Sequence, residues 1–301
     1  MATHRLSDDE MRGFIRNGYV QVKTELPAEF HQDVWDQTEA LFESEGNPGN
    51  NLMARIPAMR KVFDDPAVDG ALAGVLGDNY YMHPHRHCHY RAPHSEGQQI
   101  HKDSFTKRRH HTRWILAMYY PQDTTVDMGP TAVIPGTQYY NWLRGPIGVQ
   151  RRIDSTEGEV PMAVDAGTVL IVHYDVWHRG MPNESDKKRY MMKFLFTRME
   201  EPRGPSWDSQ QSEWVPDDDD GHHAMWGHMW RWHYGATNGD VGSGGAEGAI
   251  PDLIRRLQVD SESPCLDAAY ELGAMGAAPV PALVDTLGHE SETVRKNASY
   301  A

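Results

Sequence analysis

Cysteine is scarce in this chain, with only Cys88 and Cys265 among 301 residues. Two cysteines cannot form a disulfide framework, so we expect a reducing compartment, which favours the cytoplasm. Long apolar runs are also missing: no stretch approaches 18 apolar residues, and no membrane span is predicted. The N-terminal sequence MATHRLSDDEMRGF lacks the apolar segment of a secretory signal. These absences predict a cytoplasmic protein with no membrane partner.

Positive charge is in deficit as well, because 29 Lys and Arg stand against 43 Asp and Glu and give a formal net charge of −14. Such acidity argues against a nucleic-acid partner. The apolar fraction of 39 %, or about 48 % with the 27 glycines, is that of an ordinary globular protein. Histidine, by contrast, is abundant at 17 residues, and eight of them lie between His83 and His111.

The predicted secondary structure changes from helices to strands near residue 78. Residues 1–78 are predicted to be helical, with a capping box from Ser7 to Glu10 and helices over 27–43 and 66–76. Residues 79–200 have the composition of short strands between Gly, Pro and Asn turns. The expected strands are 80–90, 114–120, 131–134, 160–164, 168–174 and 189–197. This pattern favours a mainly β fold with flanking helices, built on a jelly-roll or cupin-type core.

Residues 201–236 are expected to complete this first domain as a helical insert. Trp226, Trp230 and Tyr234 share one helical face there, a pattern more typical of a core than of a ligand site. A Gly-rich linker is predicted over 237–248.

The segment 249–301 contains an internal repeat with an offset of 30 residues, in which Ile250-Pro251 returns as Val280-Pro281. Paired helices with this pattern resemble HEAT repeats. Such units need about three or more neighbours to bury their faces. We therefore expect an incomplete array, or a pair that packs on the first domain, and a protein partner or self-association through this segment.

A candidate metal site begins at His101-Lys102-Asp103. On a strand, residues two apart point to the same face, so one imidazole and one carboxylate would converge. His178, in the segment WHRG, would add a second imidazole. Two His and one carboxylate are the facial ligand set of non-haem Fe(II) oxygenases, which leaves three positions open. His173-Tyr174-Asp175 is a second candidate for the same pattern.

In this order, HKD, the turn GPTAVIPGT and WHRGMPN followed by Arg189 resemble the phytanoyl-CoA dioxygenase family of Fe(II)/2-oxoglutarate oxygenases, over roughly residues 5–200. The resemblance implies a double-stranded β-helix in which His101, Asp103 and His178 bind iron. It also implies that Arg189 pairs with the C5 carboxylate of 2-oxoglutarate, since a planar guanidinium suits a carboxylate.

The same resemblance implies that Thr131 and Gln98 also contact 2-oxoglutarate. Strand phase favours Gln99, rather than Gln98, on the face of His101. In related halogenases a small residue replaces the carboxylate, so the presence of Asp103 indicates a hydroxylase or desaturase. The expected reaction uses Fe(II), 2-oxoglutarate and O₂ to oxidise a C–H bond of a small molecule, with release of succinate and CO₂.

Residues for substrate binding are predicted from two patterns. His83, His85, His87 and His89 alternate, so they share one strand face, either as pocket lining or as a second metal site. His85 and His87 are the preferred lining residues. The basic cluster around Arg109 would attract an anionic substrate, or else lie on a solvated loop. Trp177 is expected to flank the pocket.

Two functions of other classes stay open at this stage. One is a non-catalytic cupin-like protein that senses a bound metal or ligand. The other is an interaction scaffold in which the HEAT-like repeats are the main functional element.

Overall fold

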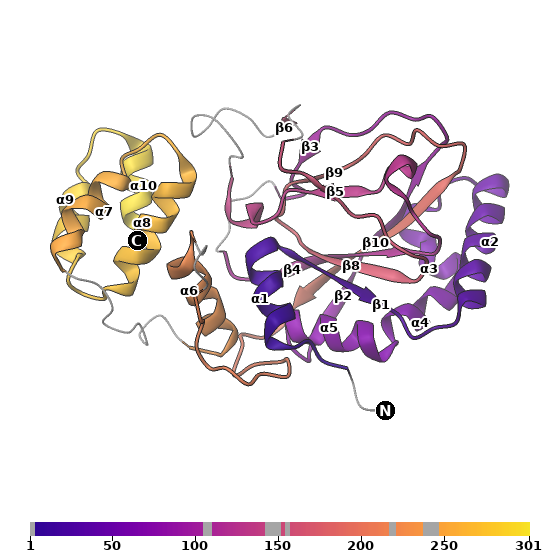
Figure 1. The fold of residues 1–301 in the computed structure, drawn as a ribbon, viewed down its shortest axis with the longest axis horizontal. Coiled ribbons are helices and arrows are strands. Elements are labelled where there is room, and N and C mark those ends of the chain that lie inside the picture. Colours follow the sequence, from indigo (N-terminus) through magenta and orange to yellow (C-terminus); the bar gives the residue numbers. More distant parts are fainter. Residues whose placement is uncertain (1–3, 105–109, 142–151, 154–156, 217–220, 237–246) are drawn as a thin grey trace. The chain divides into compact units, whose positions relative to one another are not determined.

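The computed structural model describes residues 4–104, 110–141, 152–153, 157–216, 221–236 and 247–301 (Figure 1). The chain divides into two compact units. The first is formed by Met1–Tyr139, Arg152–Glu201 and Pro205–Gln210, and the second by Tyr140–Arg151, Pro202–Gly204 and Gln211–Ala301. Residues 201–236 were expected to complete the domain of the β core, whereas most of that segment groups with the C-terminal helices.

Helices open the first unit, but they are interrupted by a strand. The helices are α1 Asp8–Asn17, α2 Ala28–Ser44, α3 Leu52–Arg55, α4 Arg60–Phe63 and α5 Pro66–Leu76. The predicted capping box is present, with the Ser7 side chain accepting from the Glu10 N–H. Strand β1 Tyr19–Lys23 was not predicted, since the region was expected to be helical throughout. Its five residues form a strand by pairing with β8 Thr168–His173.

The β core consists of two antiparallel sheets. The other strands are β2 Tyr80–Arg91, β3 Ile100–His101, β4 Trp114–Tyr120, β5 Thr131–Val133, β6 Arg152–Ile153, β7 Val160–Pro161, β9 His178–Gly180 and β10 Arg189–Arg198. One sheet has the order β1-β8-β4-β10-β2, and the other has the order β6-β3-β9-β5-β7. The predicted class, mainly β with flanking helices, is confirmed to this extent.

Alternation along β10 separates the inside of the core from the outside. Met191 and Leu195 belong to the apolar cluster inside the core, together with residues of β4, β5 and β8. Phe194 and Phe196 face the opposite way and pack on Phe63 of α4 at ring distances of 4.5 and 5.2 Å. The helices α2, α4 and α5 therefore cover the outer face of the sheet β1-β8-β4-β10-β2 (Figure 1). The odd-numbered residues of β10 are left facing the interior.

The second unit is helical in its described part. After α6 His223–His233 come α7 Ile250–Arg256, α8 Glu262–Ala274, α9 Val280–Thr286 and α10 Glu292–Tyr300. The starts of α7 and α9, and of α8 and α10, differ by the 30 residues that the repeat predicts. The similarity to HEAT repeats itself stays a prediction. On α6, Trp226 and Trp230 both lie 5.9 Å from the ring of Trp214, so this aromatic face is packed. The predicted linker, 237–248, lies mostly outside the described residues.

None of the helices in the described ranges combines the length and the apolar character that a membrane span requires.

Candidate metal centre

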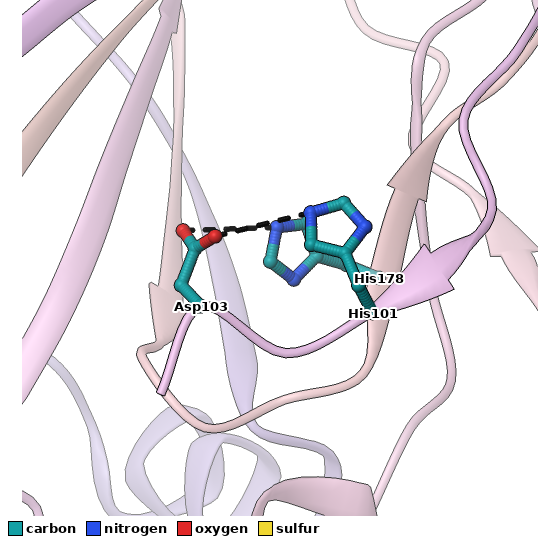
Figure 2. A group of neighbouring side chains, drawn as sticks. All are labelled: His101, Asp103 and His178. Carbon is teal, nitrogen blue, oxygen red and sulfur yellow. Dashed lines mark ion pairs between the residues drawn. The ribbon is translucent and has the colours of Figure 1, made fainter. Parts of the chain in front are cut away.

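Two neighbouring strands, β3 and β9 of the sheet β6-β3-β9-β5-β7, bring the predicted metal ligands together. His101 ends β3 and lies opposite His178, the first residue of β9, in the antiparallel register. Asp103 follows two residues after His101, beyond the end of the strand (Figure 2). The expectation that all of HKD lies on a strand therefore holds only for His101. A turn, rather than strand alternation, brings the carboxylate back toward the two imidazoles.

The three side chains lie at distances that one metal ion can bridge. His101 Nε2 is 3.8 Å from Asp103 Oδ1, and His178 Nε2 is 3.9 Å from Asp103 Oδ2. Atoms that each lie about 2.0–2.2 Å from one ion can be at most about 4.4 Å apart. These two separations meet that limit. Across the described chain, His101, Asp103 and His178 are the one group of three or more His, Cys, Asp or Glu residues whose ligand atoms all lie within 4.8 Å of one another.

Backbone carbonyls hold both imidazoles in one orientation. His101 Nδ1 donates to Gln99 O over 2.8 Å, and His178 Nδ1 donates to Val176 O over 3.0 Å. Because a carbonyl can only accept, Nδ1 carries the proton in each ring and Nε2 presents its lone pair to Asp103. Burial also lowers the pKa of His178 to about 4, which keeps its ring neutral, as a metal ligand must be.

A buried lysine holds the carboxylate of Asp103. Lys193, on the interior face of β10, is 7 % exposed, and its Nζ donates to Asp103 Oδ2 over 2.9 Å. Burial acts to raise the pKa of Asp103. In acid, where His178 is protonated as well, the charges of His178 and Lys193 outweigh this effect and lower the pKa of Asp103 to about 2. Since His178 is neutral near pH 7, the ammonium group of Lys193 is the cation that keeps Asp103 ionised there.

Beside these ligands lies a cavity of about 120 Å³. Its lining includes His101, His178, Lys193 and Arg189. Because one water takes up about 30 Å³ of the liquid, a cavity of this size has room for roughly four waters. That is room for a small organic acid and not for a large substrate.

Arg189 is almost fully buried, with 1 % of its surface exposed. Its Nε and Nη2 donate to Gly129 O over 3.1 and 2.7 Å, and its Nη1 donates to His89 O over 3.0 Å. In the part of the chain that the structure describes, no carboxylate pairs with this guanidinium. A buried, charged group with neutral partners alone is suited to receive an anion.

Thr131 and Gln98 both line this same cavity. Thr131 is buried, and its Oγ1 accepts a hydrogen bond from Tyr120 over 3.0 Å. Gln98 precedes β3, and its Oε1 accepts from the N–H of Gly180 over 3.0 Å. Gln99, which strand phase favoured, is not among the lining residues. Strand phase does not govern Gln98 and Gln99, because both precede the two-residue strand β3.

The residues predicted to bind the substrate do not all line the cavity. The rings of His85, His87 and His89 follow one another at 5.1 and 4.5 Å, which agrees with a shared face. Only His89 of these three lines the cavity. Trp177 is 1 % exposed and does not line it. Arg109 lies outside the described residues.

The alternative pair, His173 and Asp175, is buried and has a different set of neighbours. His173 Nδ1 is 3.9 Å from Asp175 Oδ2, and Lys102 Nζ is 3.8 Å from Asp175 Oδ1. No third ligand joins this pair within the described part of the chain. The structure therefore favours the HKD segment as the metal centre.

Lys193 and Arg91 belong to the cavity wall but were missed by sequence reasoning. Lys193 could have been found from strand periodicity, because it lies four residues after Arg189 and shares its face. Arg91 lies opposite Arg189 in the β2–β10 pairing, and that register is not readable from the sequence.

The facing antiparallel sheets and the ligand set define a cupin-type metal site. The sequence pattern of the phytanoyl-CoA dioxygenase (PhyH) family matches residues 14–191, and the chain belongs to this family. A search of curated proteins gave no match.

Three solved structures show a similar fold. The epimerase SnoN, in complex with Fe³⁺, alpha ketoglutarate and nogalamycin RO, is 15 % identical with a TM-score of 0.51, over 63 % of this chain and 82 % of that one. The carbocyclase SnoK from nogalamycin biosynthesis is 17 % identical with a TM-score of 0.52, over 75 % and 92 %. HygX from Streptomyces hygroscopicus, with nickel and 2-oxoglutarate bound, is 13 % identical with a TM-score of 0.51, over 71 % and 97 %. At these identities the likeness establishes a shared fold.

Proposed function

We propose that this protein is a non-haem Fe(II)- and 2-oxoglutarate-dependent oxygenase that hydroxylates or desaturates a small molecule and releases succinate and CO₂. Its family supports the reaction class. The observation that carries the proposal is the meeting of His101, Asp103 and His178 beside a cavity that also holds the buried Arg189.

Iron fits this site on the chemistry of its donors. Two neutral imidazole nitrogens and one carboxylate oxygen are the facial ligand set of non-haem Fe(II) oxygenases, with positions left for other ligands. When bound, Fe(II) contributes the activation of O₂ together with the oxidative decarboxylation of 2-oxoglutarate. His101, Asp103 and His178 would hold the ion. Lys193 keeps the carboxylate ionised and limits its rotation.

The cavity fits 2-oxoglutarate by size and by charge. Arg189 would bind the distal carboxylate, because a guanidinium presents paired N–H donors to two oxygens. Thr131 and Gln98 also line the cavity and offer polar contacts. Burial of Arg189 excludes water from this ion pair, which strengthens it.

The substrate is proposed to be a small anionic molecule. The row His85, His87 and His89 leads from the exposed part of β2 to the cavity, and burial lowers the pKa of His87 to about 4. These rings would be neutral near pH 7 and act as hydrogen-bonding contacts. The anionic preference rests on the basic cluster around Arg109.

The test is an anaerobic titration of the purified protein with Fe(II) and 2-oxoglutarate, followed by a screen of O₂ consumption over small acids, amines and CoA esters. We expect saturable binding of both, and O₂ consumption with one substrate class. Binding without O₂ consumption for any candidate would favour a non-catalytic sensor instead.

Replacement of the anchor for the distal carboxylate provides a second test. An Arg189→Ala variant should need a much higher 2-oxoglutarate concentration for half-maximal binding, because the distal carboxylate loses its ion pair. An unchanged requirement would remove Arg189 from the co-substrate site.

A further inference from the structure

A second arginine stands beside Arg189 on the cavity wall. Arg91 is the last residue of β2 and lies directly opposite Arg189 in the antiparallel pairing of β2 with β10. Both residues line the cavity. Arginine stays protonated in proteins, so two positive charges share one side of this small space.

Neutral groups are the partners of both guanidiniums. Arg91 Nη1 donates to Glu96 O over 2.7 Å, and its Nη2 donates to Gly180 O over 3.4 Å. Arg189 likewise donates to backbone carbonyls alone. Over the described ranges, no carboxylate lies within ion-pair distance of either group. The third cation of the wall, Lys193, is paired with Asp103.

Two like charges held close together at a partly buried site are costly unless an anion joins them. Arg189 directs its Nε, Nη1 and Nη2 toward carbonyl groups, whereas Arg91 uses only its two terminal nitrogens. A guanidinium has five N–H donors, so Arg91 retains more of them for a ligand.

The absence of a side chain at Gly180 leaves space for the end of the Arg91 side chain. A Cβ at Gly180 would lie 2.6 Å from Arg91 Nη2 and 3.0 Å from Gln98 Oε1. Only a residue without a side chain lets both groups lie against β9 here. Gly180 is two residues after His178, so the strand that presents a metal ligand also supports Arg91.

We propose that Arg91 is a second binding residue for the distal carboxylate of 2-oxoglutarate and that, with Arg189, it selects dicarboxylic over monocarboxylic 2-oxo acids. This inference rests on the proposed function. One carboxylate would then receive donors from two strands, β2 and β10. The pair of positive charges would gain the counter-ion that the described residues do not supply.

The experiment compares two ligands of equal chain length, 2-oxoglutarate and 2-oxopentanoate, which lacks the distal carboxylate. Binding is measured by calorimetry under nitrogen with the Mn(II)-loaded protein, which needs no turnover. The variants are Arg91→Met and the charge-conserving Arg91→Lys. Arg86→Met is the matched control, since Arg86 lies on the same strand and contacts Asn50 and the sulfur of Met53 instead of the cavity.

Hydrogen bonds to a charged group contribute about 1.5–3 kcal/mol. We therefore expect Arg91→Met to weaken 2-oxoglutarate binding roughly tenfold to a hundredfold. The same change should leave 2-oxopentanoate binding unchanged, Arg91→Lys should fall between, and Arg86→Met should match the wild type.

If Arg91→Met and Arg91→Lys weaken the binding of both ligands equally, or of neither ligand, Arg91 does not have this role. The proposed function would survive that result, provided that the wild type binds 2-oxoglutarate and Arg189→Ala weakens this binding. A wild-type protein that binds no 2-oxoglutarate would overturn both.

Discussion

At the scale of single residues, the candidate metal centre depends on groups that hold the ligands as well as on the ligands. Two carbonyls fix the protons of His101 and His178 on Nδ1. Lys193 holds one oxygen of Asp103, which lies beyond the end of its strand. A ligand on a turn has no ladder of backbone hydrogen bonds around it, so its side-chain partner determines its orientation.

Replacing Lys193 by Met should therefore weaken metal binding. Loss of a group that holds a metal ligand typically costs about tenfold to a hundredfold in affinity. The measurement is the dissociation constant for Mn(II) or Co(II) by calorimetry. Lys188→Met is the control, because Lys188 pairs with Glu39 and does not line the cavity. Equal or tighter metal binding in Lys193→Met would show that the lysine does not support Asp103.

Gly180 gives a second prediction at this scale. In Gly180→Ala the new methyl group meets the ends of the Arg91 and Gln98 side chains, which must move away from β9. We expect weaker 2-oxoglutarate binding by calorimetry, with a small change in melting temperature. Gly13→Ala is the control, since nothing lies within 4 Å of its added methyl group. Wild-type affinity in Gly180→Ala would mean that these two side chains are not needed in their present positions.

At the scale of elements, the helical repeat places equivalent residues in different surroundings. Leu257 follows α7 and is fully buried in the apolar cluster that α7, α8, α9 and α10 share. Leu287, thirty residues later, follows α9 and is 44 % exposed, and Val280 and Val284 on the same helix are exposed as well. Two positions that the sequence cannot distinguish therefore differ in how much apolar surface they remove from water.

This difference predicts unequal effects on the free energy of unfolding. Leu257→Ala should lower it by about 2–5 kcal/mol, as expected for a buried leucine. Leu287→Ala should change it by less than about 0.5 kcal/mol. Urea unfolding followed by circular dichroism measures both. A large loss for Leu287→Ala would show that the exposed face of α9 is covered in solution.

At the scale of the whole molecule, the many histidines link stability to pH. Burial lowers the pKa of His89, His110 and His178 to about 2, 3 and 4. In the unfolded chain each would titrate near 6.5. Below pH 6.5 the unfolded chain therefore binds more protons than the folded one, and stability must decrease as the pH falls toward these lowered values.

For the metal-free protein, we expect the free energy of unfolding to be lower at pH 5.5 than at pH 7.5, by about 1 kcal/mol for each of these histidines. Urea unfolding at the two pH values measures the difference. His89→Phe should reduce it. Equal stability of the wild type at both pH values would contradict this account.

The sequence predicts the long elements and the order of the motifs better than it predicts the short strands. Dense runs of β-branched and aromatic residues, as in 114–120 and 168–173, form strands because both their faces are buried. Strands of two or three residues, such as β3 and β9, are too short to show an alternating pattern in the sequence. They form because neighbouring strands pair with them. The order of the motifs correctly predicts that His101, Asp103, His178 and Arg189 lie near one another. Arg91 depends on cross-strand register, which no local pattern encodes.

The most direct test of the central claim is the formation of succinate from 2-oxoglutarate in the presence of Fe(II) and O₂. We expect the wild-type protein to form succinate. His101→Ala, Asp103→Ala and His178→Ala should each abolish it, because each removes one of three ligands. Folding of each variant is checked by circular dichroism. Wild-type rates of succinate formation in Asp103→Ala would contradict the assignment of this site.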